Sequence, residues 1–286
     1  MAMLVVAVTA ALVAGVFWRQ SATMRATENA LAYAQAKWLM RGAVDWAGVI
    51  LREDARATSL DHLGEAWAVP LAETRLNEGD GREPVYLSGQ IRDEQAKLNL
   101  RNLVGSAGID QEELGAVRRL LALLGMEPRL AERMAQRVLD GLPARAGVDP
   151  AALGVASIED FAEVAGMGPS AIERLRPFVT VLPQATPVNA NTAPAEVLAA
   201  RIRELSLADA RRLAASRDRA YFRDRADALG RLAELKLQAG DAQIAVTTKF
   251  FSVDGSVIYQ RARLQSRALL RRESRRIDVL WLREAS

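Results

Sequence analysis

The chain has 286 residues, 50% of them hydrophobic and 26% charged, which is enough for one large domain or two ordinary domains with hydrophobic cores. Its 38 basic and 35 acidic side chains alternate along most of the sequence and leave a formal charge of +3. That pattern predicts a solvated surface and weakens any field that would attract nucleic acid. With no cysteine and one histidine, His62, disulfides, thiolate catalysis and zinc sites built from cysteines or several histidines are excluded.

Residues 1–18, with the sequence MAMLVVAVTAALVAGVFW, carry no charged side chain. At about 1.5 Å per residue, a helix of this length spans roughly 27 Å, close to the thickness of a bilayer core. A cleavable signal peptide has a basic segment before its apolar run and small residues at the cleavage site. Here Phe17, Trp18 and Arg19 close the run instead. We therefore expect residues 1–20 to be a retained transmembrane segment.

Residues 21–57 contain no proline and are rich in Ala, Leu, Met, Gln, Glu and Arg, which are good helix formers. This composition predicts that the helix continues from the membrane into water as an amphipathic stalk. Ala30, Leu31, Ala34 and Trp38 recur at three- and four-residue spacing. We expect this stripe to pack on a globular domain, and the stalk face that includes Trp38 to meet helices of partner subunits.

The rest of the chain divides into segments whose residue patterns are typical of strands or of helices. A turn-rich stretch, 76–84, precedes an expected strand at 87–93, and further strands are expected over 243–253, 256–265 and 277–282, with Asp254-Gly255 as a hairpin turn. Residues 99–240 have helical periodicity broken by Gly and Pro. The sequence predicts an α+β fold in which the long helix packs on a small antiparallel sheet formed by 58–98 and 241–286, with a helical domain over 99–240 inserted between strands.

Residues 158–178, IEDFAEVAGMGPSAIERLRPF, resemble a helix-hairpin-helix element with Gly166-Met167-Gly168 as its turn, and 188–229 resembles a degenerate second copy in which Leu205-Ser206-Leu207 replaces the glycine turn. Such turns can present backbone N–H groups to a phosphate. Four acidic side chains surround the first hairpin, whose cations are Arg174 and Arg176; the acidic residues are Glu159, Asp160, Glu163 and Glu173. We therefore favour a packing role, and nucleic acid is not an expected partner. The alternative function is a membrane-tethered helix-hairpin-helix DNA-binding protein of the competence type.

The segment VNANTAPAEVL places Asn189 and Asn191 before an expected helix. Thr192 is suited to cap that helix, Pro194 to occupy its first turn, and Glu196 to lie near its positive end. A structural capping role accounts for this segment. His62 lies beside Asp61 and Glu65, and we favour a structural role for it over a role in a hydrolase.

Clustered carboxylates offer the oxygen ligands that calcium prefers. The candidates are Glu78, Asp80 and Glu83 in the turn-rich stretch, and Asp93 and Glu94 after the expected strand. Their spacing does not match an EF-hand loop, so solvated turn residues are the favoured interpretation. The sequence gives no certain cofactor, and calcium is a possible bound ion.

The order of several segments resembles the K subunit of the type II (general) secretion pathway, a large minor pseudopilin. The apolar amino terminus, LREDARATSLDHLGEAWAVPL, LSGQIRDEQAKLNLRNL, GMGPS, VNANTAPAEVL and FFSVDG follow one another in that order. The resemblance implies a non-enzymatic assembly subunit anchored once in the bacterial inner membrane, with its carboxy-terminal bulk in the periplasm. It implies as partners the I and J subunits, the major pseudopilin and exported proteins. Calcium sites are known in the family, but the resemblance assigns them to no residue here.

The resemblance also implies that Met1 is exposed when a prepilin peptidase removes a short basic leader, and that its amine is methylated. The lost leader would balance Arg19 and Arg25 under the positive-inside rule. Most pilin-like proteins carry glutamate at the fifth mature position, where this sequence has Val5. A subunit with no protomer ahead of it has no use for that carboxylate, so Val5 implies a place at the filament tip. Contacts in the membrane and filament are expected from Val5, Leu12, Phe17 and Trp18.

Overall fold

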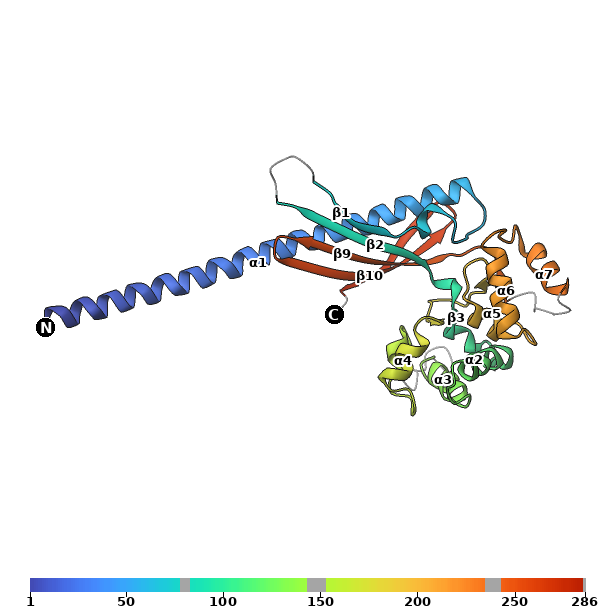
Figure 1. The fold of residues 1–286 in the computed structure, drawn as a ribbon. Coiled ribbons are helices and arrows are strands. Elements are labelled where there is room, and N and C mark those ends of the chain that lie inside the picture. Colours follow the sequence, from blue (N-terminus) through green and yellow to red (C-terminus); the bar gives the residue numbers. More distant parts are fainter. Residues whose placement is uncertain (78–82, 143–152, 235–242, 285–286) are drawn as a thin grey trace.

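The computed structural model describes residues 1–77, 83–142, 153–234 and 243–284, which form one long helix, a five-stranded antiparallel sheet and six shorter α-helices (Figure 1). The long helix, α1, runs without a break from Ala2 to Ala57. This confirms that the helix continues beyond the apolar segment. Residues 1–31 are exposed throughout, and the first buried residue of α1 is Ala32. Figure 1 accordingly shows the amino-terminal half of α1 standing clear of the rest of the molecule.

The carboxy-terminal half of α1 packs on the sheet through small side chains. Its buried residues are Ala32, Ala36, Met40, Val44, Ala47, Gly48 and Leu51. The prediction that Ala30, Leu31, Ala34 and Trp38 pack on a globular domain was wrong. All four side chains are exposed, Trp38 to 71%. Two stripes have helical spacing in this segment, and the one with smaller side chains lets the helix approach the strands closely.

The sheet has the strand order β1-β2-β9-β10-β11. The strands are β1 (Leu71–Arg75), β2 (Val85–Asp93), β9 (Phe250–Tyr259), β10 (Ala262–Glu273) and β11 (Arg276–Glu284). Strands β2 and β9 pair antiparallel from Val85 opposite Tyr259 to Asp93 opposite Phe251. The strand predicted at 87–93 is therefore confirmed, and the α+β class holds. The chain between β2 and β9, residues 94–249, is called the insert below.

The predicted hairpin turn at Asp254-Gly255 was wrong, because β9 runs through both residues and the turn lies at Gln260, which has a φ of +54°. Gly255 instead lies opposite Gly89 of β2, and a Cβ built on it would meet Met40 Sδ of α1 at 2.9 Å. This glycine allows the helix and the sheet to approach closely. In the sequence alone, a glycine needed for close packing looks the same as a glycine needed for a turn.

The insert is mostly helical and has its own hydrophobic core, which includes Leu120, Met134, Phe161, Leu198 and Phe222. Figure 1 shows it beyond the end of the sheet that is farther from the amino terminus. The domain boundaries 99 and 240 stay a prediction. The α-helices of the insert are α2 (Gln111–Leu123), α3 (Leu130–Asp140), α4 (Pro169–Leu175), α5 (Ala195–Arg201), α6 (Leu207–Arg217) and α7 (Arg225–Glu234).

Short strand pairs and single turns of 3-10 helix connect these helices. Parallel pairs join β3 (Leu98–Asn99) to β6 (Val179–Thr180) and β7 (Val188–Asn189) to β8 (Ile244–Ala245), and β4 (Val104–Gly105) pairs antiparallel with β5 (Gly108–Ile109). The 3-10 turns are η1 (Ala66–Ala68), η2 (Glu94–Ala96), η3 (Leu100–Leu103) and η4 (Ile158–Phe161).

Candidate functional site

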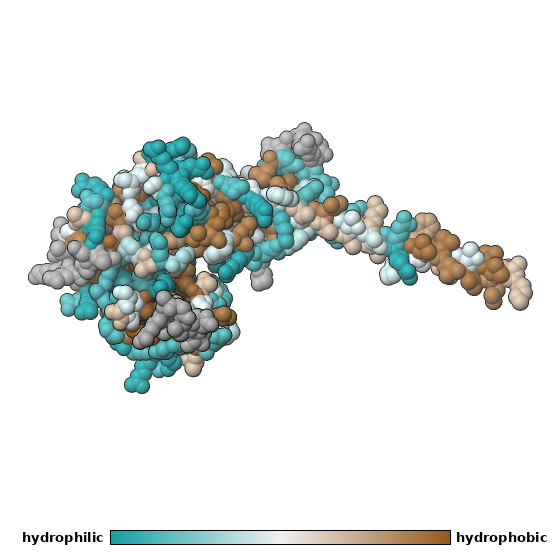
Figure 2. All heavy atoms as spheres, turned by 180° about the vertical axis from the view of Figure 1, so that it is seen from behind, coloured by the Kyte–Doolittle hydropathy of each residue, from teal (hydrophilic) through white to brown (hydrophobic). Residues whose placement is uncertain are grey.

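The amino-terminal part of α1 is an exposed apolar rod. Val5, Leu12, Phe17 and Trp18 are each at least 61% exposed, and the structure places them with Met1 on the part of the helix that stands clear of the sheet. By length and composition α1 could cross a membrane, with a mean hydropathy of 2.0 in its most apolar window. Figure 2 shows this hydrophobic free end, followed by a hydrophilic band before the globular part. So large an apolar surface calls for lipid or protein around it.

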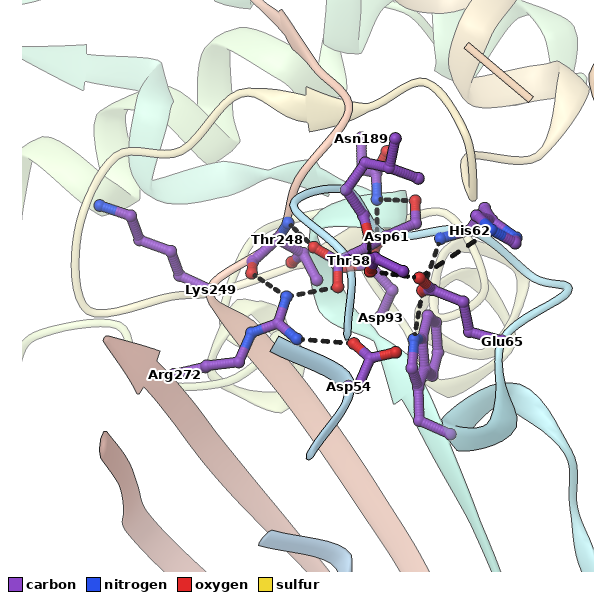
Figure 3. A network of polar contacts seen from close by, with 12 residues as sticks. Asp54, Thr58, Asp61, His62, Glu65, Asp93, Asn189, Thr248, Lys249 and Arg272 are labelled. Carbon is purple, nitrogen blue, oxygen red and sulfur yellow. Dashed lines mark hydrogen bonds and ion pairs between the residues drawn. The ribbon is translucent and has the colours of Figure 1, made fainter. Parts of the chain in front are cut away.

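A second feature is a polar network at the meeting point of α1, the sheet and the insert (Figure 3). Arg272 of β10 donates from Nη1 to Asp54 Oδ2 of α1 at 2.9 Å, and from Nη2 to Asp61 Oδ1. Asp61 is 1% exposed and also accepts a hydrogen bond from the Thr248 backbone N–H at 2.7 Å. One guanidinium thus ties the end of the long helix and the loop after it to β10.

The insert joins this network through the segment that contains the two asparagines. Asn189 Nδ2 donates to Asp93 Oδ2 at 2.9 Å and to the Asp61 carbonyl at 3.1 Å, and Thr192 Oγ1 donates to Asp93 Oδ2 at 2.6 Å. The predicted capping role of Thr192 was wrong, because α5 begins at Ala195 with Pro194 as its N-cap. Both side chains instead fasten the insert to the end of β2.

Burial raises the pKa of several carboxyl groups in the network. The pKa of Asp54 rises to about 6 because the group is desolvated and lies near Glu65 and Asp61, against the opposing effect of Arg272. Burial also raises the pKa of Asp93 to about 6, although Thr192 and Asn189 donate to it. Desolvation by burial therefore outweighs the hydrogen bonds, and at Asp54 also the charge of Arg272, that favour the ionised carboxylates.

The carboxylates of Asp54, Asp61 and Glu65 do not fit a calcium cradle, because protein donors already occupy them. Ligand atoms of Asp54, Asp61 and Glu65 lie within 4.8 Å of one another, but Arg272 pairs with the first two. Glu65 Oε2 accepts from Trp67 Nε1 at 2.7 Å.

Asp93, Glu94 and Glu83 are the calcium candidates from the sequence that the structure describes. Asp93 accepts from Asn189 and Thr192, and both carboxylate oxygens of Glu94 accept from Lys97 Nζ at 3.0 Å. Glu83 is exposed, and Glu78 and Asp80 lie outside the described residues. Calcium binding therefore stays a prediction without an assigned site.

His62 contributes a contact between the loop after α1 and the insert. Its ring stacks on Tyr221 with the ring centroids 4.1 Å apart and the planes 10° from parallel. Its Nδ1 accepts a hydrogen bond from the Gly64 N–H at 3.1 Å. This environment agrees with the structural role favoured from the sequence.

The glycine turn predicted at 166–168 joins η4 to α4, and Gly166 has a φ of +92°. Met167 is fully buried in the core of the insert. Arg176 pairs with Glu159 and Glu173, and Arg174 Nη2 donates to the Leu124 carbonyl. The hairpin's own cations are thus engaged within the protein, which agrees with the packing role favoured from the sequence.

Sequence comparisons support one family over most of the chain. Two family models, both described as type II secretion system protein K, match residues 96–184 and 188–247. Type II secretion system protein K of Pseudomonas aeruginosa is 31% identical over 278 residues, which covers 89% of this chain and 82% of that protein. The protein K of Klebsiella pneumoniae is 30% identical over 315 residues and covers 99% and 94% respectively.

A solved structure shows the same fold. One chain of the GspK-GspI-GspJ complex from the type 2 secretion system of enterotoxigenic Escherichia coli matches with a TM-score of 0.68 and 18% identity, covering 91% of this chain and 99% of that chain. The comparisons give no support to a competence-type DNA-binding protein. Given the two protein K relatives, which align over most of their own lengths, this chain belongs to the type II secretion system protein K family.

Proposed function

We propose that this minor pseudopilin assembles with the I and J subunits at the tip of the type II secretion pseudopilus, where it initiates or caps the filament during protein export, and that it has no enzymatic activity. The observation that carries the tip position is the placement of the insert. It lies beyond the end of the sheet that is farther from the membrane helix (Figure 1), where it would obstruct a further subunit stacked above. The structural relative was solved as a GspK-GspI-GspJ complex, which supports the choice of partners.

The proposed location is the inner membrane, crossed once by residues 1–20, with the sheet and insert in the periplasm. The exposed apolar rod of α1 supports this arrangement because residues 1–31 are exposed in the chain by itself. Arg19 and Arg25 would lie on the periplasmic side, where the positive-inside rule disfavours them, and the basic leader implied by the family would supply the balancing charge on the other side during insertion. The major pseudopilin and exported proteins are further proposed partners.

Deletion of residues 1–18 tests the tip assignment. The deletion removes exposed residues and no part of the buried stripe of α1, so the product is expected to be a folded soluble domain. Mixed with soluble forms of the I and J subunits, it should elute with both in size-exclusion chromatography. Failure to bind either subunit, with the domain folded by circular dichroism, would remove the tip assignment.

Mass spectrometry of the native amino terminus tests the proposed maturation. A chain extracted from membranes should begin at Met1 and carry one methyl group on its amine. A terminus inside or after the apolar segment would mean that the anchor is cleaved off, which contradicts the proposal. An unmethylated Met1 would overturn the maturation step alone.

A further inference from the structure

A polar cleft of about 480 Å³ lies between the insert and the face of the sheet opposite α1. Side chains alternate along β10: Ala268 and Leu270 pack in the core beneath α1, whereas Leu269 packs with Leu182 of the insert. Figure 1 likewise shows α1 and α4 on opposite sides of the sheet. The sheet wall of the cleft includes residues of β9, β10 and β11, and the insert wall includes residues of η4, α4 and β6.

Two arginines of the sheet wall lie directly opposite each other in neighbouring strands. Arg267 of β10 is in register with Arg283 of β11 and, on its other side, with Asp254 of β9. All three side chains line the cleft. Asp254 accepts a hydrogen bond from Arg267 Nε and also pairs with Arg92 Nη1 at 3.1 Å, so one carboxylate serves two guanidinium groups. Because like charges directly opposite each other in antiparallel strands repel, this wall of the cleft is locally basic.

The other acidic side chains that line the cleft are bound to cations of the protein. The pairs are Glu94 with Lys97, Glu159 and Glu173 with Arg176, and Glu284 with Lys37 of α1. The hydrogen bond to Asp254 raises the pKa of Arg267, and the charge of Arg176 opposes that rise. A third guanidinium group therefore lies near the pair on the sheet wall.

Trp281 supplies an aromatic surface beside the two arginines. Its ring packs against the buried cluster that includes Phe250 and Leu269, and the Arg283 guanidinium lies 4.8 Å from the ring centre. An arginine stacked on an aromatic ring is held in place while its N–H donors stay available in the guanidinium plane. The cleft thus offers positioned guanidinium donors next to an apolar surface.

We propose that this cleft binds an extended acidic segment of an exported protein, with a carboxylate held by Arg267 and Arg283 and an apolar side chain against Trp281. The inference rests on the proposed function and adds to it the place and the chemistry of substrate binding. Two neighbouring guanidinium groups provide the paired donors that a carboxylate accepts. A cleft of about 480 Å³ has the size of a pocket for a small ligand, so it admits a few side chains of a peptide and not a folded domain.

The lining of the cleft selects among anionic ligands. A free phosphate would leave the ring of Trp281 without a contact, and a nucleic acid would bring a continuous row of phosphates against Glu159 and Glu173. A peptide combines carboxylates, main-chain groups and apolar side chains, which matches this mixed lining. The cleft lies on the face opposite α1, so its occupation leaves the membrane helix free for assembly. We therefore assign the cleft to an exported protein and not to a subunit of the filament.

The substitution Arg283→Glu in the full chain tests the site. A glutamate there faces Arg267 as an opposite charge, so the variant should be at least as stable as the parent while it loses the carboxylate site. Fluorescence anisotropy in detergent, with a labelled hexapeptide of alternating glutamate and tyrosine as the probe, should show an affinity about tenfold lower. Arg263→Glu is the matched control and should keep the parent affinity, because Arg263 is an exposed arginine on the same face of β10 that does not line the cleft.

Three results with the peptide would overturn the proposal. They are unchanged affinity in the Arg283→Glu variant, equal affinity for a peptide with glutamine in place of glutamate, and displacement of the peptide by an equal concentration of inorganic phosphate. The last result would show a site for simple anions only.

A photo-crosslinking residue in place of Ala156, an exposed residue that lines the cleft, identifies the occupant in secreting cells. Crosslinks to an exported protein that disappear in the Arg283→Glu variant would support the proposal, and crosslinks only to the I or J subunit would overturn it. If the parent chain bound neither I nor J, the proposed function would fail. Absence of peptide binding and of crosslinks to exported proteins, with I and J still bound, would overturn this inference alone.

Discussion

Arg272 is the residue on which the junction of helix, sheet and insert depends most. Its guanidinium pairs with Asp54 and Asp61, donates to the Thr248 carbonyl at 3.1 Å and lies 4.8 Å from the ring centre of Phe251. Asp61 is almost completely buried. A buried carboxylate that loses its cationic partner bears a large desolvation cost, so the network is sensitive to the removal of this one side chain.

The substitution Arg272→Met should lower the free energy of unfolding by about 3–5 kcal/mol, because it keeps the apolar stem but leaves Asp61 unpaired. Arg271→Met is the matched control. Arg271 is the neighbour on the same strand and pairs with Asp278, and both side chains are partly exposed. The control should cost about 1 kcal/mol or less. Urea denaturation of the soluble domain measures both, and equal losses in the two variants would contradict the assigned role.

The raised pKa values in the same network predict a pH dependence of stability. Asp54 and Asp93 have pKa values of about 6 in the folded chain against 3.8 ordinarily, so between pH 4 and 6 the folded state binds more protons than the unfolded state. The free energy of unfolding should therefore rise as the pH falls from 7 to 5.

Asp54→Asn should flatten this rise, because the amide does not titrate and can still accept the hydrogen bond from Arg272. Asp278→Asn is the control: Arg271 and Arg276 hold the pKa of Asp278 below its ordinary value, so its titration lies outside this window. Thermal unfolding followed at pH 5, 6 and 7 gives the slope. An unchanged slope in the Asp54→Asn variant would show that another group takes up the protons.

At the scale of elements, two paired glycines allow close packing in and on the sheet. Gly255 of β9 faces Met40 of α1, and Gly89 of β2 pairs with Gly255 and lies close to the backbone of β9. A Cβ on Gly89 would meet the Asp254 carbonyl oxygen at 2.9 Å. That oxygen belongs to the backbone of a central strand and has no freedom to move aside.

The substitution Gly89→Ala should therefore lower the free energy of unfolding by about 1–3 kcal/mol through overpacking. Gly105→Ala, where the added Cβ meets no atom within 4 Å, should change it by less than about 0.5 kcal/mol. Chemical denaturation of the two variants side by side provides the comparison. A neutral Gly89→Ala would mean that β2 and β9 separate at little cost.

These elements also show what sequence patterns predict well. Helix α1 was predicted because long proline-free runs of good helix formers leave few alternatives, and the strand ending at Asp93 was predicted from alternation after a turn. The buried face of α1 was assigned wrongly because Trp38 is more hydrophobic than Ala36, whereas close approach favours alanine. Asp254-Gly255 and Thr192 were assigned to local turn and capping roles, but both act through residues distant in sequence. The network around Arg272 joins residues 54 to 272, which no local pattern connects.

At the scale of the whole molecule, the exposed rod of α1 makes no contribution to the hydrophobic core formed by the rest of α1, the sheet and the insert. Residues 1–31 are exposed, whereas the buried stripe of α1 starts at Ala32 and includes Met40, which packs with Leu87 and Val257 of the sheet. The apolar rod, which by length and composition could cross a membrane, thus lies outside the folded core, and the next half of the same helix forms part of that core.

Two truncations test this division. Removal of residues 1–18 should leave the midpoint of thermal unfolding within about 2 °C of the full chain in the same detergent, because no buried contact is lost. Removal of residues 1–40 takes away Ala32, Ala36 and Met40 together, and since one large buried side chain alone is worth about 2–5 kcal/mol, the product should unfold or aggregate. Differential scanning calorimetry distinguishes the outcomes. A stable fold without residues 1–40 would show that the contacts of Ala32, Ala36 and Met40 are dispensable for folding. A large loss of stability on removing residues 1–18 would show that the rod contacts the rest of the protein.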